Sequence, residues 1–240
     1  SGMTRLGMGE EEFADLLAQP ALLRRANLQL VLSHLACADE AGHSQNALQQ
    51  KAFADMVGRL RQVCPGLPAS LANSAGICLG EDFQFELVRP GCALYGVNPT
   101  PAQANPMRPV VNLRLPVLQL RRVGSDCAVG YGATQTAAAG SWLAVVRGGY
   151  ADGILRAQSG RGRGVALVGD ERVPVPMLGR VSMDTSVFDV SALSAGERAQ
   201  LCMIEVLGDS LTVDHMGAAA GTIGYEILTS LGHRYCRQYR

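Results

Sequence analysis

A proline-rich stretch divides the 240-residue sequence into two parts with different periodicities. Between Asn98 and Pro109 prolines recur without any regular spacing of apolar residues, which is typical of a linker. Before this stretch, apolar runs alternate with amphipathic segments, and after it short alternating segments follow one another. We therefore predict two domains, residues 1–108 and residues 109–240, with different architectures.

The first domain has the pattern of a β/α barrel. Mostly apolar runs at 28–35, 67–72 and 83–89 predict buried parallel strands. Residues 10–19 and 46–61 have apolar positions on one face and predict helices. Because a complete barrel has eight strand–helix units and about 250 residues, we expect this domain to be only the C-terminal part of a β/α (TIM-type) barrel. On this interpretation the N-terminal half of the barrel is missing from the sequence.

The second domain is predicted to be mainly β-strand. Strands are expected around Pro116, at 181–187 and at 203–207, and a hairpin is expected at 165–175, turning at Gly169-Asp170-Glu171. Two short helices should close the chain. They are separated at Gly221, and the second is expected to be capped by Thr222 and to end at Gly232.

Composition limits the functions that such a chain can have. Hydrophobic residues make up 48% of the sequence, enough for one large or two modest cores. A net charge of zero leaves no basic field for nucleic acid or an anionic membrane. We find no signal peptide and no apolar run of membrane-spanning length. The seven cysteines lack a Cys-x-x-Cys pair, so we expect reduced thiols, no metal site and a cytoplasmic location.

Two tyrosines stand between small residues, in Ala128–Thr134 and in Gly148–Gly153. Glycine allows tight turns and close approach of a ligand. A phenol flanked in this way is expected to point into a cavity. The alternative is a hairpin bend with an ordinary half-buried tyrosine, which is common turn chemistry.

Three polar residues fall at or just after the ends of the predicted barrel strands: His34, Ser74 and Arg89. Functional groups of β/α barrels lie at the carboxyl ends of the strands. A buried arginine needs an acceptor, and taken alone Arg89 is expected to form an ion pair with a carboxylate. Without further information, His34 could be a hydrogen-bonded core histidine and Ser74 a simple loop serine.

Two further segments extend these patterns, Leu87–Gly96 (LVRPGCALYG) and Gly179–Asp184 (GRVSMD). Together with the tyrosine motifs, they make nearly the whole chain similar to the alanine racemase family. The resemblance implies an enzyme that uses pyridoxal 5'-phosphate to interconvert L-alanine and D-alanine. It also implies a homodimer in which the tyrosine of one subunit works on the cofactor held by the other.

The resemblance assigns a cofactor site. Arg89 matches the arginine that hydrogen-bonds the pyridine nitrogen, and because arginine keeps its proton, the ring nitrogen stays unprotonated. Ser74, Gly91 and Cys92 match the segments that contact the phosphate. Tyr225 matches the family tyrosine that also reaches the phosphate and narrows the access route.

The resemblance also assigns catalytic and substrate-binding residues. Tyr131 matches the tyrosine that exchanges a proton on one face of the α-carbon. A phenol has an ordinary pKa near 10, so it needs positive neighbours, and Arg5 and His34 match family residues close to it. Arg5 and the backbone amide of Met183 match groups that bind the substrate carboxylate. Five further matches place residues in the access channel: Asp39, Tyr150, Arg156, Arg180 and Ile223.

The sequence departs from the family at the second base. That base is a lysine in the first barrel strand, which also holds the cofactor as a Schiff base, and its motif does not occur here. Lys51 is the only lysine in the sequence, and it lies opposite Phe53 on its predicted helix, so we expect it to face solvent. The lysine of a two-base mechanism would therefore lie outside this chain.

The absent lysine keeps other interpretations open. The chain could belong to a broad-specificity amino-acid racemase of the same fold, with a wider channel near Tyr131, Ile223 and Tyr225. It could also be a non-catalytic scaffold that binds cofactor or dimerises without turnover. A fold-related amino-acid decarboxylase fits less well, because its C-terminal cysteine motif has no match here.

Overall fold

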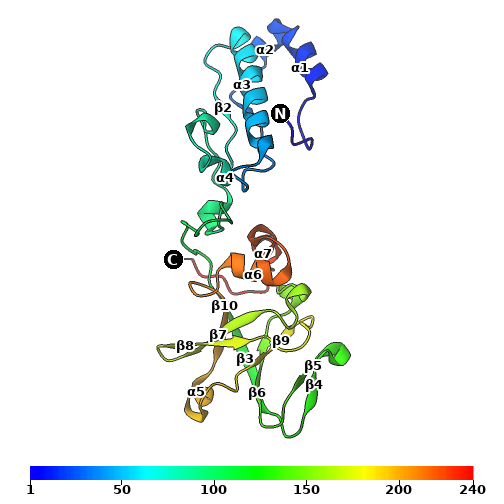
Figure 1. The fold of residues 1–240 in the computed structure, drawn as a ribbon, viewed down its shortest axis with the longest axis vertical. Helices are drawn as coiled ribbons and strands as arrows, with labels where there is room; N and C mark the ends of the chain where they lie inside the picture. The colour runs from blue at the N-terminus through cyan, green and yellow to red at the C-terminus, as the bar shows by residue number, and fades with distance from the viewer. Residues whose placement is uncertain (240) are drawn as a thin grey trace. The chain divides into compact units, whose positions relative to one another are not determined.

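A computed structural model describes residues 1–239, which form two compact units. Unit 1 comprises Ser1–Leu94 and Asn98–Met107, and unit 2 comprises Tyr95–Val97 and the chain from Arg108 onward. Residues 98–109 contain no helix or strand. Figure 1 shows the helices and strands of both units.

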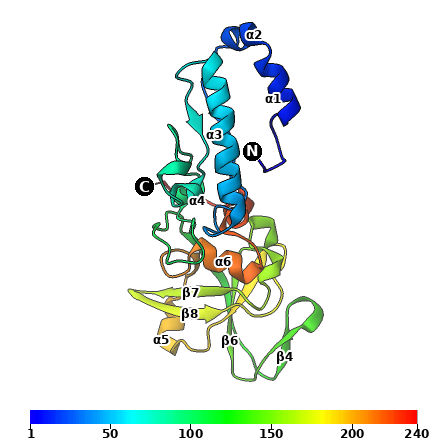
Figure 2. The same ribbon diagram turned by 45° about the horizontal axis from the view of Figure 1, so that its top comes forward.

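Three helices build most of unit 1: α1 (Glu10–Leu17), α2 (Pro20–Arg25) and α3 (Ser44–Val63). The acidic first turn of α1 and Pro20 at the start of α2 are favourable at helix N-termini. α1 and α2 pack together against α3 (Figure 2), where they bury Phe13 and Leu23. The inward face of α3 contributes Phe53, Val57 and Leu60, as its periodicity predicts.

The strands of unit 1 are much shorter than the apolar runs predict. β1 (Val31–Leu32) and β2 (Ala69–Ser70) form a parallel pair of two residues each, with Val31 opposite Ala69, and a single parallel bridge joins Asn73 to Arg89. Leu35, Leu71 and Phe53 belong to the core cluster beside this pair. A short helix, α4 (Ser74–Ile77), follows β2 directly. The predicted order of strand, polar loop and helix is therefore present in abbreviated form.

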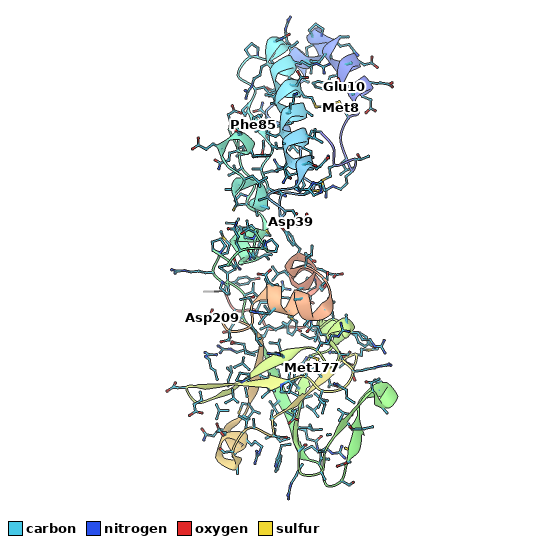
Figure 3. The ribbon with its side chains drawn as sticks, viewed as in Figure 1. Met8, Glu10, Asp39, Phe85, Met177 and Asp209 are labelled. Atoms are coloured by element: carbon cyan, nitrogen blue, oxygen red, sulfur yellow. The ribbon has the colours of Figure 1, made fainter. Side chains whose placement is uncertain are left out.

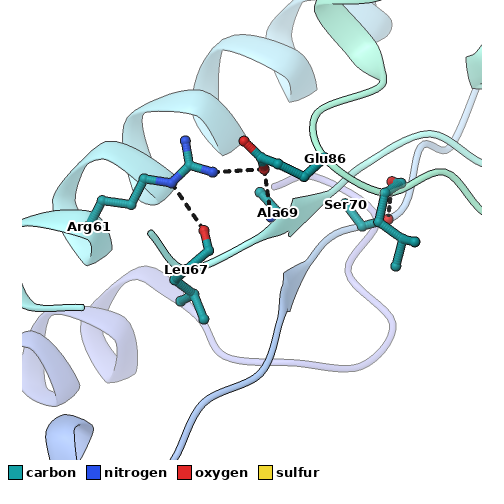
Figure 4. A network of polar contacts seen from close by, with 6 residues as sticks. Arg61, Leu67, Ala69, Ser70 and Glu86 are labelled. Carbon is teal, nitrogen blue, oxygen red and sulfur yellow. Dashed lines mark hydrogen bonds and ion pairs between the residues drawn. The ribbon is translucent and has the colours of Figure 1, made fainter. Parts of the chain in front are cut away.

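The segment 83–89 is not the regular strand that its sequence suggests. Phe85 has a φ of 54°, which interrupts extended pairing. Instead, the carboxylate of Glu86 accepts hydrogen bonds from the amide of Ala69 (2.8 Å) and from Arg61 (2.7 Å), as Figure 4 shows. The hydroxyl of Ser70 donates to the carbonyl of Leu87 (2.7 Å). Side-chain anchors thus replace part of a β ladder at this edge.

Phe85 also contributes to the core of unit 1. Its ring meets the ring of Phe53 edge-on, with 5.0 Å between the centroids, a favourable aromatic geometry. Figure 3 labels Phe85 beside α3. The interruption of the strand therefore directs an aromatic side chain onto the helix.

Unit 2 is built on a six-stranded antiparallel sheet with the order β8-β7-β10-β3-β6-β9. Its fully buried side chains include Leu115, Val146, Phe188 and Ile204, one from each of the four strands β3, β6, β9 and β10. A separate hairpin pairs β4 (Cys127–Val129) with β5 (Gln135–Ala137). The sheet strands are β3 (Leu113–Arg122), β6 (Trp142–Arg147), β7 (Arg163–Val168), β8 (Glu171–Pro176), β9 (Thr185–Asp189) and β10 (Met203–Leu207).

Several predicted elements of unit 2 occur, with shifted bounds. The β7–β8 hairpin turns at Gly169-Asp170, close to the predicted turn. The alternation that begins at Val181 becomes a strand only from Thr185. Three helices complete the unit: α5 (Ala195–Gln200), α6 (Val213–Ala220) and α7 (Gly224–Ser230). α6 and α7 pack together (Figure 1), and Ile223 rather than Thr222 precedes α7 as its N-cap.

Candidate functional site

Arg89 is anchored in unit 1 by neutral oxygen atoms. Its Nη1 donates to the hydroxyl of Ser70 (2.5 Å), and its Nη2 donates to the carbonyls of Ser33 (2.6 Å) and Leu71 (3.3 Å). Within residues 1–239 no carboxylate lies within ion-pair distance of Arg89. The ion pair that burial alone would favour is therefore not formed. Burial lowers the pKa of Arg89, but arginine stays charged in proteins.

His34 lies beside this guanidinium, with its Nδ1 3.3 Å from Nη2 of Arg89. Burial, and then the charges of Arg89 and Arg5, lower the pKa of His34 below its ordinary value. The imidazole is therefore mainly neutral at neutral pH. Arg5 itself is solvent-exposed, and its charge is the smallest of the three causes that lower the pKa of His34.

Ser74 begins α4 and is buried. Its hydroxyl accepts a hydrogen bond from the amide of Ala93 (3.2 Å), which ties α4 to the segment that contains Gly91 and Cys92. Asn73 caps the helix by accepting from the amide of Gly76 (2.9 Å). The first amides of a helix have no partner within it, so donors are available here. Ser74, Gly91 and Cys92 thus lie on two joined segments.

Among the described residues, no hydrogen bond or ion pair joins Asp39 to His34, Ser74 or Arg89. Asp39 is exposed, in the turn between β1 and α3 (Figure 3). The structure therefore brings His34 and Arg89 together, with Arg5 acting on His34 through its charge, and holds Ser74 by a separate contact with the amide of Ala93.

Tyr131 lies at the tip of the β4–β5 hairpin in unit 2, in the 3₁₀ turn Tyr131–Ala133. Gly130 has a φ of 73°, a conformation that favours glycine, and a Cβ there would lie 3.2 Å from the amide nitrogen of Arg180. The turn therefore packs closely on the 179–184 segment. The Tyr131 side chain is 69% exposed, so its own unit does not enclose the phenol in a cavity.

Tyr150 and Met183 lie on two segments joined by backbone hydrogen bonds. The amide of Tyr150 donates to the carbonyl of Ser182 (3.0 Å), and the amide of Ala151 donates to the carbonyl of Met183 (3.0 Å). A Cβ on Gly149 would lie only 2.2 Å from the carbonyl oxygen of Ser182, so this approach requires glycine. These contacts fix the backbone on both sides of Met183.

The amide of Met183 has no hydrogen-bond partner among the described residues, and the residue is 54% exposed. Because an unpaired amide at the surface can donate to an anion, this N–H is a candidate carboxylate ligand. The alternation that predicts a strand through Met183 is wrong at this position. The carbonyls of residues 182–184 point instead to the amides of the 148–151 loop.

Arg156 and Arg180 belong to the same group of loops. Arg156 begins the 3₁₀ turn Arg156–Gln158, and its carbonyl accepts from the hydroxyl of Ser159 (2.5 Å). That hydroxyl accepts in turn from the amide of Val181 (3.0 Å), the residue after Arg180. Unit 2 therefore brings together Tyr131, Tyr150, Arg156, Arg180 and Met183 on three linked loops.

Tyr225 and Ile223 stand at the beginning of α7, and both are largely exposed. The other end of α7 packs against the Tyr150 loop, because a Cβ on Gly153 would lie 2.3 Å from the carbonyl oxygen of Ser230. The tyrosine therefore belongs to unit 2, whereas the predicted phosphate contacts Ser74, Gly91 and Cys92 belong to unit 1.

Sequence reasoning missed residues that hold these groups in place. Gln49 is fully buried on α3, where it accepts from the amide of Ala36 (2.9 Å) and donates to the carbonyl of His34 (2.9 Å). A polar residue at an inward helical position was the signal that could have identified it. Arg234, at the C-terminal end, joins Asp152 and Asp184, and no sequence signal indicated this pairing.

Lysine, cysteine, metal-binding and membrane-spanning features were also predicted from the sequence. Lys51 is exposed on α3. The seven cysteines are free. Among residues 1–239 no three His, Cys, Asp or Glu side chains gather in a way that could hold a metal ion. None of the described helices combines the length and apolar character needed to cross a membrane.

Two family profiles match the chain. "Alanine racemase, N-terminal domain" covers residues 1–99, and "Alanine racemase, C-terminal domain" covers residues 110–239. The alanine racemase of Rhodospirillum rubrum is 49% identical over 239 residues, covering 100% of this chain and 62% of the relative. The catabolic alanine racemase of Mesorhizobium japonicum is 46% identical, covering 100% and 60%. The chain therefore spans about 60% of the length of these curated relatives.

Solved structures give the same similarity. The alanine racemase from Bartonella henselae with covalently bound pyridoxal phosphate superposes with a TM-score of 0.86 at 36% identity, covering 100% of this chain and 64% of that one. The alanine racemase from Streptomyces coelicolor A3(2) superposes with a TM-score of 0.86 at 32% identity, covering 97% and 62%. Both units of the chain are thus similar to parts of known alanine racemases.

Proposed function

Because the chain belongs to the alanine racemase family, we propose that the intact protein interconverts L-alanine and D-alanine with pyridoxal 5'-phosphate as cofactor. The observation that carries this proposal is the setting of Arg89. Its guanidinium is held by neutral oxygens and lies beside the imidazole of His34, and no carboxylate among the described residues lies within ion-pair distance. Such a donor suits a neutral acceptor, as the unprotonated ring nitrogen of the cofactor would be.

The residues present fit this cofactor. Arg89 would meet the pyridine nitrogen, and Ser74, Gly91 and Cys92 would meet the phosphate beside the first amides of α4. Tyr225 would also reach the phosphate. When bound, pyridoxal phosphate supplies the electron sink that makes the α-hydrogen of an amino acid removable.

We propose that the phenol of Tyr131 moves the proton on one face of the α-carbon. Neutral His34 and the cationic Arg5 would be its polar neighbours in the assembled site. The exposed position of Tyr131 at a hairpin tip supports a homodimer with shared active sites, in which the phenol reaches the barrel of the other subunit. Such a protein would be cytoplasmic.

The substrate would be held by its carboxylate. The unpaired amide of Met183 and the charge of Arg5 would bind it, as donor and counter-charge. We propose that five residues line the access channel of the assembled site: Asp39, Tyr150, Arg156, Arg180 and Ile223.

A second base is needed on the opposite face of the α-carbon. Lys51 is exposed on the outer face of α3, so we propose that the lysine is supplied from outside this chain. Strictness for alanine over larger amino acids would depend on the channel near Tyr131, Ile223 and Tyr225.

Isotope exchange in deuterium oxide tests the role of Tyr131 in the intact protein. Tyr131→Phe should reduce net racemisation by about 10²–10⁴-fold, the usual contribution of a general base. One alanine enantiomer should still exchange its α-hydrogen, because the other face keeps its base. Tyr95→Phe, at another exposed tyrosine, is the matched control. Racemisation by Tyr131→Phe near the wild-type rate would disprove the assignment.

Subunit complementation tests the shared site. Mixing inactive Tyr131→Phe and Arg5→Ala proteins should restore activity in a fraction of heterodimers, since one of their two sites would carry both native residues. If the active site is formed within one subunit, mixing restores nothing.

A further inference from the structure

The C-terminal segment links the two loops that carry Tyr150 and Met183. Nε of Arg234 lies 3.1 Å from Oδ1 of Asp152, and Nη1 lies 2.6 Å from Oδ1 of Asp184. The Asp152 side chain is only 5% exposed, whereas the Arg234 and Asp184 side chains are 43% and 53% exposed. Arg234 therefore connects a buried carboxylate to one at the surface.

Both carboxylates are next to site residues in the chain. Asp152 closes the 3₁₀ turn Tyr150–Asp152, and its Oδ2 accepts from the amide of Gly149 (3.1 Å). Asp184 directly follows Met183, and its backbone carbonyl accepts from the amide of Gly148 (2.9 Å). The ion pairs thus reinforce the backbone bonds that join the two loops.

The backbone near Arg234 is itself attached to the same place. The amide of Gly232 donates to the carbonyl of Asp152 (3.1 Å). The position of Arg234 is therefore restricted by its backbone, because the chain is fixed two residues earlier at Gly232. Asp184 and Asp152 also raise the pKa of Arg234.

The charge of Asp184 matters for any anion at Met183. A carboxylate in the next residue repels a second carboxylate that approaches the free amide, and it does so over a few ångströms. Arg234 compensates this charge and holds it toward Asp152. Loss of Arg234 would leave the Asp184 charge uncompensated and the 182–184 segment less firmly held.

We propose that Arg234 is a positioning residue that prepares the Met183 amide to bind a small aliphatic carboxylate, the substrate group of the proposed racemase. The proposal rests on the proposed function for the identity of that carboxylate. Arg234 acts through Asp184 and Asp152 and has no contact of its own with substrate.

Equilibrium binding of propionate to the cofactor-loaded intact protein tests this proposal by calorimetry, independently of turnover. Propionate carries the carboxylate and methyl group of alanine without the amino group. Arg234→Gln should weaken propionate binding by about tenfold, in the range that small misplacements cost. It should raise KM for alanine to a similar extent and leave kcat within about threefold. Arg234→Lys should restore part of the affinity.

A double variant separates charge compensation from simple loss of structure. Arg234→Gln with Asp184→Asn should bind propionate more tightly than Arg234→Gln alone, because the repelling charge has gone. Arg237→Gln is the matched control, since Arg237 donates to the carbonyls of Leu231 and Gly232. Its propionate affinity should equal that of the wild type.

A second double variant, Arg234→Gln with Asp152→Asn, allows the test even if Arg234→Gln alone does not fold. If Arg234→Gln does not fold because buried Asp152 loses its partner, adding Asp152→Asn removes that charge, and the tenfold weakening should persist. Unchanged propionate affinity and KM in a folded variant, with only a lower Tm, would overturn the proposal. If the wild type does not racemise alanine but Arg234→Gln still weakens propionate binding, the proposed function fails and the positioning role stands.

Discussion

The two units hold their site residues by different means. In unit 1, buried polar side chains hold the site residues through hydrogen bonds. Gln49 bonds the backbone at His34 and Ala36, and Ser70 bonds Arg89. In unit 2, backbone hydrogen bonds join the 148–151 loop to Ser182–Asp184, and glycine permits this close approach. The ion pairs of Arg234 reinforce these bonds. The difference indicates which kind of substitution each unit tolerates.

A unit organised by side chains is sensitive to losing polar atoms, since a buried group left without a partner is costly. A unit organised by close backbone approach is sensitive to gaining atoms, since a packed interior resists added volume.

Trp142, the only tryptophan, lies in unit 2, and the centroid of its ring is 4.7 Å from the guanidinium carbon of Arg198. Its fluorescence therefore reports on unit 2, while amide exchange in α3 reports on unit 1.

The largest effect is expected from Gly149→Ala in unit 2. The new Cβ would lie 2.2 Å from the carbonyl oxygen of Ser182 and 2.4 Å from that of Met183. Neither backbone atom can move without separating the loops, so we expect a loss of about 3 kcal/mol or more in the free energy of unfolding. Urea unfolding followed by Trp142 fluorescence measures it.

Gly196→Ala is the matched control for this substitution. A Cβ at Gly196 meets nothing within 4 Å, and the residue lies in α5, where alanine is favoured by about 1 kcal/mol. Equal losses of unfolding free energy in the two variants would show that the close backbone approach at Gly149 is not what makes the substitution costly. The proposed difference between unit 2 and unit 1 would then lose its basis.

A smaller effect is expected from Gln49→Ala in unit 1. The substitution leaves the amide of Ala36 and the carbonyl of His34 without their partner, which should cost about 1–3 kcal/mol. Hydrogen exchange of α3 amides should accelerate, while Trp142 fluorescence should report an unchanged unit 2. Gln50→Ala, which loses one exposed bond to Asp82, should change stability by no more than about 0.5 kcal/mol. An effect of Gln49→Ala as small as that of Gln50→Ala would contradict the role of the buried amide.

The smallest effect is expected from pH, again in unit 1. The folded-state pKa of His34 lies below its ordinary value of 6.5, so the unfolded chain takes up this proton first as pH falls. Unit 1 should therefore lose stability as pH falls from about 8 through 6.5 toward the folded pKa. The loss should be smaller in His34→Gln. Exchange rates of α3 amides across this range measure the change, and identical pH profiles for both proteins would refute it.

The sequence predicted elements whose signals are local. The inward spacing of Phe53, Val57 and Leu60 predicts α3, and Gly169-Asp170 predicts the β7–β8 turn. The expected combination of a partial barrel with a β domain agrees with the family at this level of detail. These features need only neighbours along the chain.

Features that depend on distant contacts were missed. The strand expected at 83–89 is interrupted at Phe85, and Glu86 is held instead by contacts with Ala69 and Arg61, which lie far away in sequence. The alternation through Met183 fails because carbonyls there bond the 148–151 loop. The site residues were proposed from resemblance. Gln49 could have been recognised as a polar residue at an inward helical position, whereas nothing in the sequence indicated the pairing of Arg234.

The single lysine of the chain has a chemical consequence for the proposed cofactor. Pyridoxal phosphate is an aldehyde, which condenses with free amines, whereas guanidinium groups stay protonated. Because Lys51 is the only side-chain amine and the other basic side chains are arginine and histidine, the arginines of this chain can bind the phosphate, while the aldehyde finds very few side-chain amines with which to condense unproductively.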